Sequence, residues 1–118
     1  MYRIFVVEDD TALALAMKKH LETYGNEIAI AEDFTDIVGE FRKTAPQLVL
    51  LDILLPFYTG FYWCSEIRKC SSVPIVFLSS ASDNMNIVMA INMGADDFIA
   101  KPFDGSVLMA KIQAMLRR

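Results

Sequence analysis

The chain has 118 residues, of which 54% are hydrophobic and 22% charged, and we expect one globular domain at residues 1–118 rather than a disordered chain. Its formal net charge of −4 argues against direct binding of nucleic acid, because phosphate backbones require a basic protein surface. The longest apolar run, 48–55, is interrupted by Asp52 and is far shorter than the ~20 residues of a spanning helix, so we expect no membrane span.

Short apolar runs in the chain predict β-strands. They lie at residues 4–7, 28–31, 48–51, 75–78 and 98–100. The first, third and fourth runs are continuous rather than alternating, which is typical of strands buried on both faces of a parallel sheet.

Longer segments between these runs predict helices. They lie at 11 to about 24, about 33–43, about 60–70, about 84–93 and about 106–117. In the first of them, Leu13, Met17 and Leu21 are spaced four apart, so they share one face. Strand and helix alternate along the whole chain, which indicates an α/β fold with a parallel sheet. Right-handed crossovers then place helices on both faces of that sheet.

Two further features indicate the compartment. Residues 1–7 begin a strand pattern with no basic segment ahead of a long apolar stretch, so we expect no signal peptide. Cys64 and Cys70 lie on one predicted helix and point in different directions, so a bond between them is not expected. Reduced thiols are typical of a cytoplasmic protein, which is the location we expect.

Polar side chains follow four of the apolar runs directly. They are Glu8, Asp9 and Asp10 after the first, Asp52 after the third, Ser79 and Ser80 after the fourth, and Lys101 after the fifth. In a parallel sheet these positions share one edge, at the carboxyl ends of the strands, where open α/β folds bind their ligands. The sequence therefore brings acids, a hydroxyl and an amine to one region.

This set of side chains suits phosphoryl transfer to a carboxylate. The acids Glu8, Asp9 and Asp52 would repel one another unless a cation joined them, and hard oxygen ligands suit Mg²⁺. Asp52 can then act as a nucleophile that forms an aspartyl-phosphate. Lys101 would supply positive charge to the phosphoryl oxygens, and Ser79 would supply a hydroxyl donor.

At these residues the sequence resembles the response-regulator receiver family across essentially its whole length. The matching motifs are VEDD at 7–10, LD at 51–52, LP at 55–56 with Gly60, FLSS at 77–80, GADDF at 94–98 and KPF at 101–103. Each motif alone is weak, but together, in order and at the family's spacing, they are specific. The resemblance implies a doubly wound, flavodoxin-like (βα)5 fold with strand order 2-1-3-4-5, and a histidine kinase as phosphoryl donor.

The resemblance also implies the roles of the site residues. Asp9, Asp52 and the backbone carbonyl of Leu54 would hold Mg²⁺, with Glu8 acting through water. The peptide bond between Lys101 and its neighbouring proline would be cis, a form largely confined to bonds before proline.

Switching and output follow from the same resemblance. The Ser79 hydroxyl would move toward the phosphoryl group, and Phe98, where tyrosine is common, would turn inward behind it. The protein would then form a homodimer through the fourth helix, fifth strand and fifth helix. Asn92 and Val107 occupy positions on that surface where acids are common. Either the usual symmetric dimer does not form, or its interface is more hydrophobic than usual. The apolar residues of 85–93 can also be read as core.

The ending at residues 101–103 resembles receivers that precede a winged-helix DNA-binding domain, which this chain does not contain. Residues 61–64 and the tandem Ser79-Ser80 are similar to regulators of the bacitracin-resistance type. Those regulators serve cell-envelope and antimicrobial-peptide responses in Gram-positive bacteria.

Three other functions share part of this pattern. A phosphatase of the haloacid-dehalogenase type needs a second acid two residues past its nucleophile, where this chain has Leu54. A flavodoxin-like nucleotide-binding module needs a loop that cradles phosphate after the first strand, and residues 8–10 would repel phosphate. A receiver-like interaction domain that has lost phosphorylation stays open, because of Ser79 and Phe98.

The remaining polar residues have simple expected roles. His20, the only histidine, is expected to be solvated on the polar side of the first helix. Asp33, Asp36 and Glu40 are expected to form an exposed helix face. Asp104 is expected to cap the fifth helix.

Overall fold

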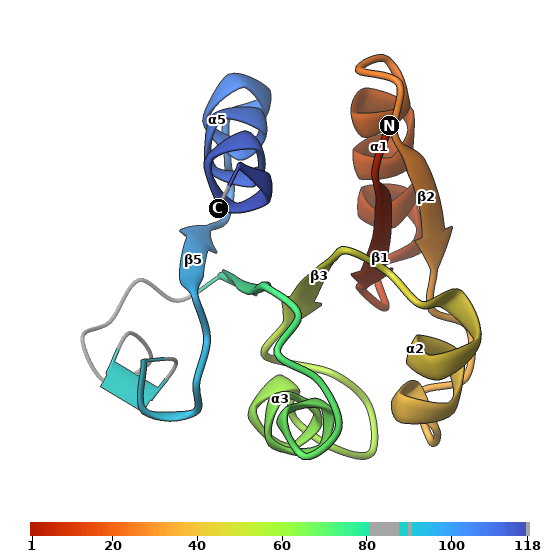
Figure 1. The fold of residues 1–118 in the computed structure, drawn as a ribbon, viewed down its shortest axis with the longest axis vertical. Helices are drawn as coiled ribbons and strands as arrows, with labels where there is room; N and C mark the ends of the chain where they lie inside the picture. The colour runs from red at the N-terminus through yellow and green to blue at the C-terminus, as the bar shows by residue number, and fades with distance from the viewer. Residues whose placement is uncertain (81–87, 90, 118) are drawn as a thin grey trace.

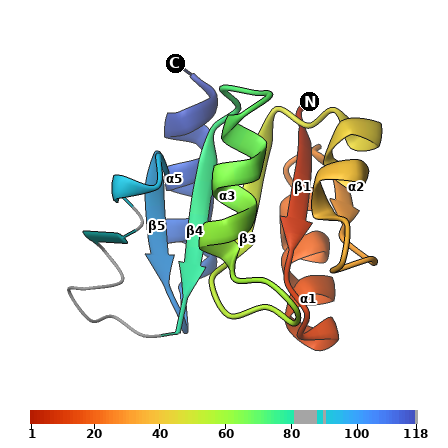
Figure 2. The same cartoon turned by 90° about the horizontal axis from the view of Figure 1, so that it is seen from below.

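A computed structural model describes residues 1–80, 88–89 and 91–117. Its sheet has the strands β1 (Arg3–Val7), β2 (Glu27–Ile30), β3 (Leu48–Asp52), β4 (Ile75–Ser79) and β5 (Asp97–Ala100). All neighbouring strands pair in parallel, in the order β2-β1-β3-β4-β5. The expected strand order is therefore confirmed, and Figure 2 shows the strand arrows pointing the same way.

The helices cover both faces of the sheet. They are α1 (Thr11–Glu22), α2 (Ile37–Thr44), α3 (Gly60–Arg68) and α5 (Gly105–Leu116). Figure 1 shows α1 and α5 on one face and α2 and α3 on the other. Alternate residues of β1 serve two cores: Phe5 packs in the core under α2 and α3, whereas Ile4 packs in the core under α1 and α5. The doubly wound architecture is confirmed, and every residue of β3 and β4 is buried as expected for central parallel strands.

The ends of the helices differ from the predictions in places. The second helix begins at Ile37, not near residue 33, because the Asp36 carboxylate caps it by accepting a hydrogen bond from the Gly39 N–H at 3.0 Å. Asp33 instead accepts hydrogen bonds from the backbone and hydroxyl of Thr35 in the preceding turn. The third helix ends at residue 68. Half of the predicted helix at 84–93 lies outside the described residues, and of its described residues 88, 89, 91 and 92 are helical.

Two polar residues have more specific contacts than predicted. His20 is half-buried rather than fully solvated, and its Nε2 lies 3.2 Å from the carbonyl oxygen of Gly105 at the start of α5. A Cβ at Gly105 would lie 2.8 Å from that nitrogen, so glycine permits the close approach. Glu40 is half-buried and accepts hydrogen bonds from the backbone N–H groups of residues 32 and 33. The expected cap at Asp104 is confirmed by a 2.7 Å hydrogen bond from the Ser106 N–H.

The two cysteines are free, as expected, but their environments differ. Cys64 is buried and donates to the Met93 carbonyl at 3.3 Å, whereas Cys70 is exposed. Burial raises the pKa of the Cys64 thiol, so it carries less reactive thiolate near neutral pH than an ordinary cysteine. We expect a thiol reagent to label Cys70 quickly in the folded protein and Cys64 only after denaturation. Mass spectrometry of labelled peptides checks this, and equal rates at both thiols would contradict it.

Candidate functional site

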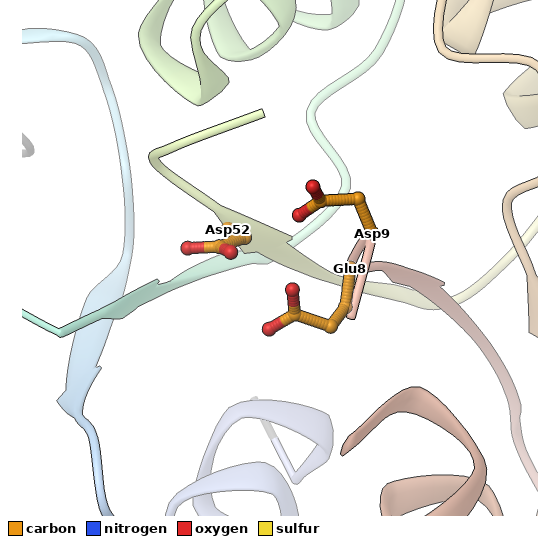
Figure 3. Close-up of side chains that lie close together, drawn as sticks. All are labelled: Glu8, Asp9 and Asp52. Carbon is orange, nitrogen blue, oxygen red and sulfur yellow. The ribbon is translucent and has the colours of Figure 1, made fainter. Parts of the chain in front are cut away.

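The register of the sheet brings the predicted site residues to one edge. Val7 in β1 pairs with Leu51 in β3, so the residues that follow them, Glu8 and Asp52, begin the same edge side by side. Figure 3 shows the carboxylates of Glu8, Asp9 and Asp52 gathered where β1 and β3 end. One oxygen from each of these three side chains lies within 4.8 Å of the others. The convergence predicted from the strand ends is therefore present.

The opposite half of the site comes from β4 and β5. Ser79 is buried at the end of β4 and pairs with Ala100, and its carbonyl accepts a 2.6 Å hydrogen bond from the Lys101 N–H. This bond places Lys101 directly beyond β5, from where its side chain crosses toward β3. The Lys101–Pro102 peptide bond is cis, as the family resemblance implied.

Lys101 links two of the carboxylates. Its Nζ lies 3.0 Å from Asp52 Oδ2 and forms a second ion pair with Glu8 Oε1. The side chains are 16% exposed for Lys101, 8% for Asp52 and 1% for Glu8, so little water screens these contacts.

Glu8 and Lys101, the two partners of one ion pair, both have shifted pKa values. Burial raises the pKa of Glu8, and this outweighs the lowering effect of the hydrogen bonds from Lys101 and the Asp10 N–H. Burial alone would lower the pKa of Lys101, but hydrogen bonds to Glu8 and Asp52 outweigh it and raise that pKa. Lys101 therefore stays an ammonium throughout the neutral range.

The donor set fits a divalent cation. Three carboxylates and one ammonium leave two negative charges, which match the charge of Mg²⁺. One oxygen from each carboxylate lies within 4.8 Å of the others, so a single small cation could contact all three side chains. Asp9 is the exposed member, and within the described part of the chain its carboxylate has no hydrogen-bond partner. Leu54 lies two residues beyond β3 with its side chain exposed, and the ligation by its carbonyl stays a prediction.

Gly60 lies against the backbone of Asp52, a packing role that the sequence did not reveal. It is the first residue of α3, and its N–H donates to the Ile53 carbonyl at 2.8 Å. A Cβ at this position would lie 2.1 Å from the backbone oxygen of Asp52. The absence of a side chain at Gly60 therefore lets α3 pack directly against the backbone of Asp52. Only a glycine at the start of a predicted helix could have signalled this.

The expected switch residue Phe98 has contacts on two sides. Its ring is half-buried and packs against the core under α2 and α3. The Nζ of Lys111 lies 5.5 Å from the ring centroid, within the range of a cation–π contact. The same ammonium donates to the Phe98 carbonyl at 3.0 Å and pairs with Asp97 at 3.3 Å.

The expected dimerisation surface is only partly described. Within the described residues, Val88, Ile91 and Val107 are 49%, 66% and 47% exposed, which supports an apolar surface there. Asp96 pairs with Arg68 at 2.9 Å inside the chain.

No helix in the described ranges is both long and apolar enough to span a bilayer.

Comparison with known proteins gives the family. The family model of the response regulator receiver domain matches residues 4–113. A transcriptional regulatory protein of Bacillus subtilis, YvcP, is 54% identical over 118 residues, which are 100% of this chain and 50% of that protein. The response regulator protein GraR of Staphylococcus aureus is 47% identical over 116 residues, 98% of this chain and 52% of GraR.

A solved structure agrees with these matches. The N-terminal domain of the nisin resistance regulator NsrR, a lantibiotic response regulator, has a TM-score of 0.91 and 44% identity, and covers 99% of each chain. The chain spans about half the length of the curated relatives it matches. These similarities favour a signalling switch over a phosphatase or a nucleotide-binding module. The chain belongs to the response-regulator receiver family of two-component signalling.

Proposed function

We propose that Asp52 accepts a phosphoryl group from a histidine kinase in a Mg²⁺-dependent reaction. The observation that carries this proposal is the position of Lys101, whose Nζ lies 3.0 Å from Asp52 Oδ2 beside the Glu8 and Asp9 carboxylates. An ammonium at this point stabilises the charge of an incoming phosphoryl group.

The reaction balances with the groups present. A carboxylate oxygen of Asp52 attacks the phosphorus of a phosphohistidine, the phosphorus–nitrogen bond breaks, and the imidazole nitrogen keeps the electron pair. Asp9, Asp52 and the Leu54 carbonyl would hold Mg²⁺, with Glu8 acting through water. When bound, the ion neutralises the repulsion between the carboxylate and the phosphoryl oxygens. Lys101 then turns its ammonium to the phosphoryl oxygens.

Phosphorylation would switch the output of a longer protein. Ser79 would supply its hydroxyl to the phosphoryl group, and Phe98 would turn inward behind it. The predicted helix at 84–93, β5 and α5 would then form a homodimer that activates a C-terminal DNA-binding domain in the cytoplasm. The length of the relatives supports such a second domain, and the name of NsrR supports a response to an antimicrobial peptide.

A small phosphodonor tests the proposal. The protein is incubated with phosphoramidate and Mg²⁺, and its intact mass is measured with and without a chelator. We expect one added phosphoryl group that requires Mg²⁺ and is absent from Asp52→Asn. A wild-type protein that takes up no phosphoryl group would instead support a receiver-like domain that has lost phosphorylation.

Slow loss of the phosphoryl group follows from the side chain at Leu54. It is 66% exposed two residues beyond Asp52 and offers no group that binds or activates water. In receivers, the residue two beyond the phosphoryl acceptor and the residue two beyond the switch hydroxyl flank the route of the hydrolytic water. The second of these positions, Ala81, lies outside the described residues. We expect Leu54→Asn to speed autodephosphorylation by roughly an order of magnitude, because an amide can orient water. Leu15→Asn on α1, also at an exposed leucine, is the control, and an unchanged rate for Leu54→Asn would count against the prediction.

The ring of Phe98 also gives a prediction. A phenylalanine has no hydroxyl to desolvate, so we expect the ring to turn inward more often than a tyrosine in the unphosphorylated protein. NMR of ring-labelled protein compares the wild type with Phe98→Tyr, each before and after phosphorylation. A Phe98 ring that stays outward before phosphorylation would refute this.

A further inference from the structure

Glu8 makes contacts that differ from those of the other two acids. Its side chain is 1% exposed, and both of its carboxylate oxygens are occupied by groups of the protein. Oε1 pairs with the Lys101 ammonium, and Oε2 accepts a hydrogen bond from the Asp10 N–H at 3.1 Å. Asp9, by contrast, is exposed. Glu8 is therefore held in place by the protein on both sides, whereas Asp9 is available to a cation.

These contacts form a chain of polar groups that ends at Asp52. Asp10 caps α1, with its Oδ1 accepting a 3.2 Å hydrogen bond from the Leu13 N–H. Its own N–H fixes Glu8, Glu8 holds the ammonium of Lys101, and the ammonium lies 3.0 Å from Asp52 Oδ2. The start of α1 is thus connected to the side chain of the proposed nucleophile through two ion pairs.

A lysine needs such support to act at one point. Its ammonium sits on a flexible four-carbon stem, and the three N–H donors of the ammonium can rotate. A small displacement of a reacting or stabilising group can cost a large factor in rate, so an anchored ammonium is worth more than a mobile one.

We propose that Glu8 is a positioning residue that holds the Lys101 ammonium at Asp52 for phosphoryl transfer, in addition to any contact with the cation through water. This inference rests on the proposed function. A residue that acts through Lys101 loses its effect when Lys101 is absent, whereas a residue that acts through the cation does not. The difference can be measured.

The test is a double-mutant cycle of wild type, Glu8→Gln, Lys101→Met and the double variant. Calorimetry first gives the Mg²⁺ concentration that saturates each protein, and the phosphorylation rate with phosphoramidate is then measured at saturation. We expect Glu8→Gln to slow the wild type by between about 10- and 100-fold, and to slow the Lys101→Met protein by less than about twofold. Lys101→Gln replaces Lys101→Met if the latter does not fold.

A second readout needs no cation and no phosphodonor. Reductive methylation of metal-free protein, followed by peptide mass spectrometry, reports how freely each lysine reacts. We expect Glu8→Gln to speed labelling of Lys101 several-fold and to leave Lys69 unchanged. Glu66→Gln is the matched control, because Glu66 pairs with Lys69 at 2.6 Å on α3. It should change labelling at Lys69 alone and leave the phosphorylation rate as it was.

The outcomes separate the two proposals. If Glu8→Gln slows both the wild type and the Lys101→Met protein by the same factor, or leaves labelling of Lys101 unchanged, Glu8 does not position Lys101. The function of Asp52 still stands in that case. If the wild type takes up no phosphoryl group at all, both proposals fall together.

Discussion

Replacing Gly60 with alanine is expected to destabilise the protein by at least about 3 kcal/mol, which lowers the thermal midpoint by about 10 °C or more. The added Cβ would lie 2.1 Å from the backbone oxygen of Asp52 and 3.0 Å from the Cα of Ile53. Both atoms belong to the backbone at the end of β3, which cannot rotate aside as a side chain does. Either α3 or the end of β3 must move, and each movement displaces Asp52.

A second glycine supplies the matched control. In Gly39→Ala the new Cβ would lie 2.2 Å from Oδ2 of Asp36, an exposed side chain that can rotate away. Losing that cap costs about 1 kcal/mol, and the better helix propensity of alanine returns about 1 kcal/mol. We therefore expect little change in the thermal midpoint of Gly39→Ala by calorimetry. Equal midpoints for the two alanine variants would contradict the packing described for Gly60.

Lys101→Met is expected to lower the free energy of unfolding by about 3–5 kcal/mol in the absence of divalent ions, because it leaves buried carboxylates without a cation. Glu8 and Asp52 are 1% and 8% exposed, and both pair with this one ammonium. Added Mg²⁺ should restore part of the lost stability by binding to the folded state alone.

The loss of unfolding free energy in Lys101→Met should depend on pH in a defined direction. The pKa of Glu8 is raised above its usual 4.5 by burial, and removing the Lys101 hydrogen bond that lowers it raises it further. A carboxyl with a raised folded-state pKa stabilises the folded state below the unfolded value and loses that contribution as the pH rises through the folded-state value. The difference between wild type and Lys101→Met should therefore be large near neutral pH and shrink toward pH 4.5.

Urea denaturation of both proteins across this pH range is the measurement. Lys69→Met is the control, because Lys69 forms an ion pair with Glu66 while its side chain is 70% exposed. That change should alter stability by less than about 1 kcal/mol at any pH. A loss for Lys101→Met that is the same at acid and neutral pH would show that the Glu8 carboxylate is not the group left without a partner.

The parts of the fold that could be predicted are those encoded by local pattern. Central strands of a parallel sheet are buried on both faces, so β3 and β4 read as continuous apolar runs and were located within one residue. The polar residues that end these runs then predicted the site, because parallel strands end at one edge. The strand order came from the family resemblance.

The features that could not be predicted depend on contacts between distant segments. Periodicity places His20 beside the polar residues of α1, but Gly105, 85 residues away, covers it. Glu8 and Lys101 are 93 residues apart, so no local pattern shows that they pair. The sequence predicts that the second helix begins near residue 33, and only the contacts in the structure show that Asp33 closes a turn with Thr35 whereas Asp36 caps α2.

Chemical mapping of the phosphoryl group tests the central claim most directly. Borohydride reduces an aspartyl-phosphate to homoserine, and peptide mass spectrometry then locates the converted residue in protein treated with phosphoramidate and Mg²⁺. We predict homoserine at position 52 alone, and none when Mg²⁺ is removed. Homoserine at another aspartate, with Asp52 intact, would contradict the assignment of Asp52 as the phosphoryl acceptor.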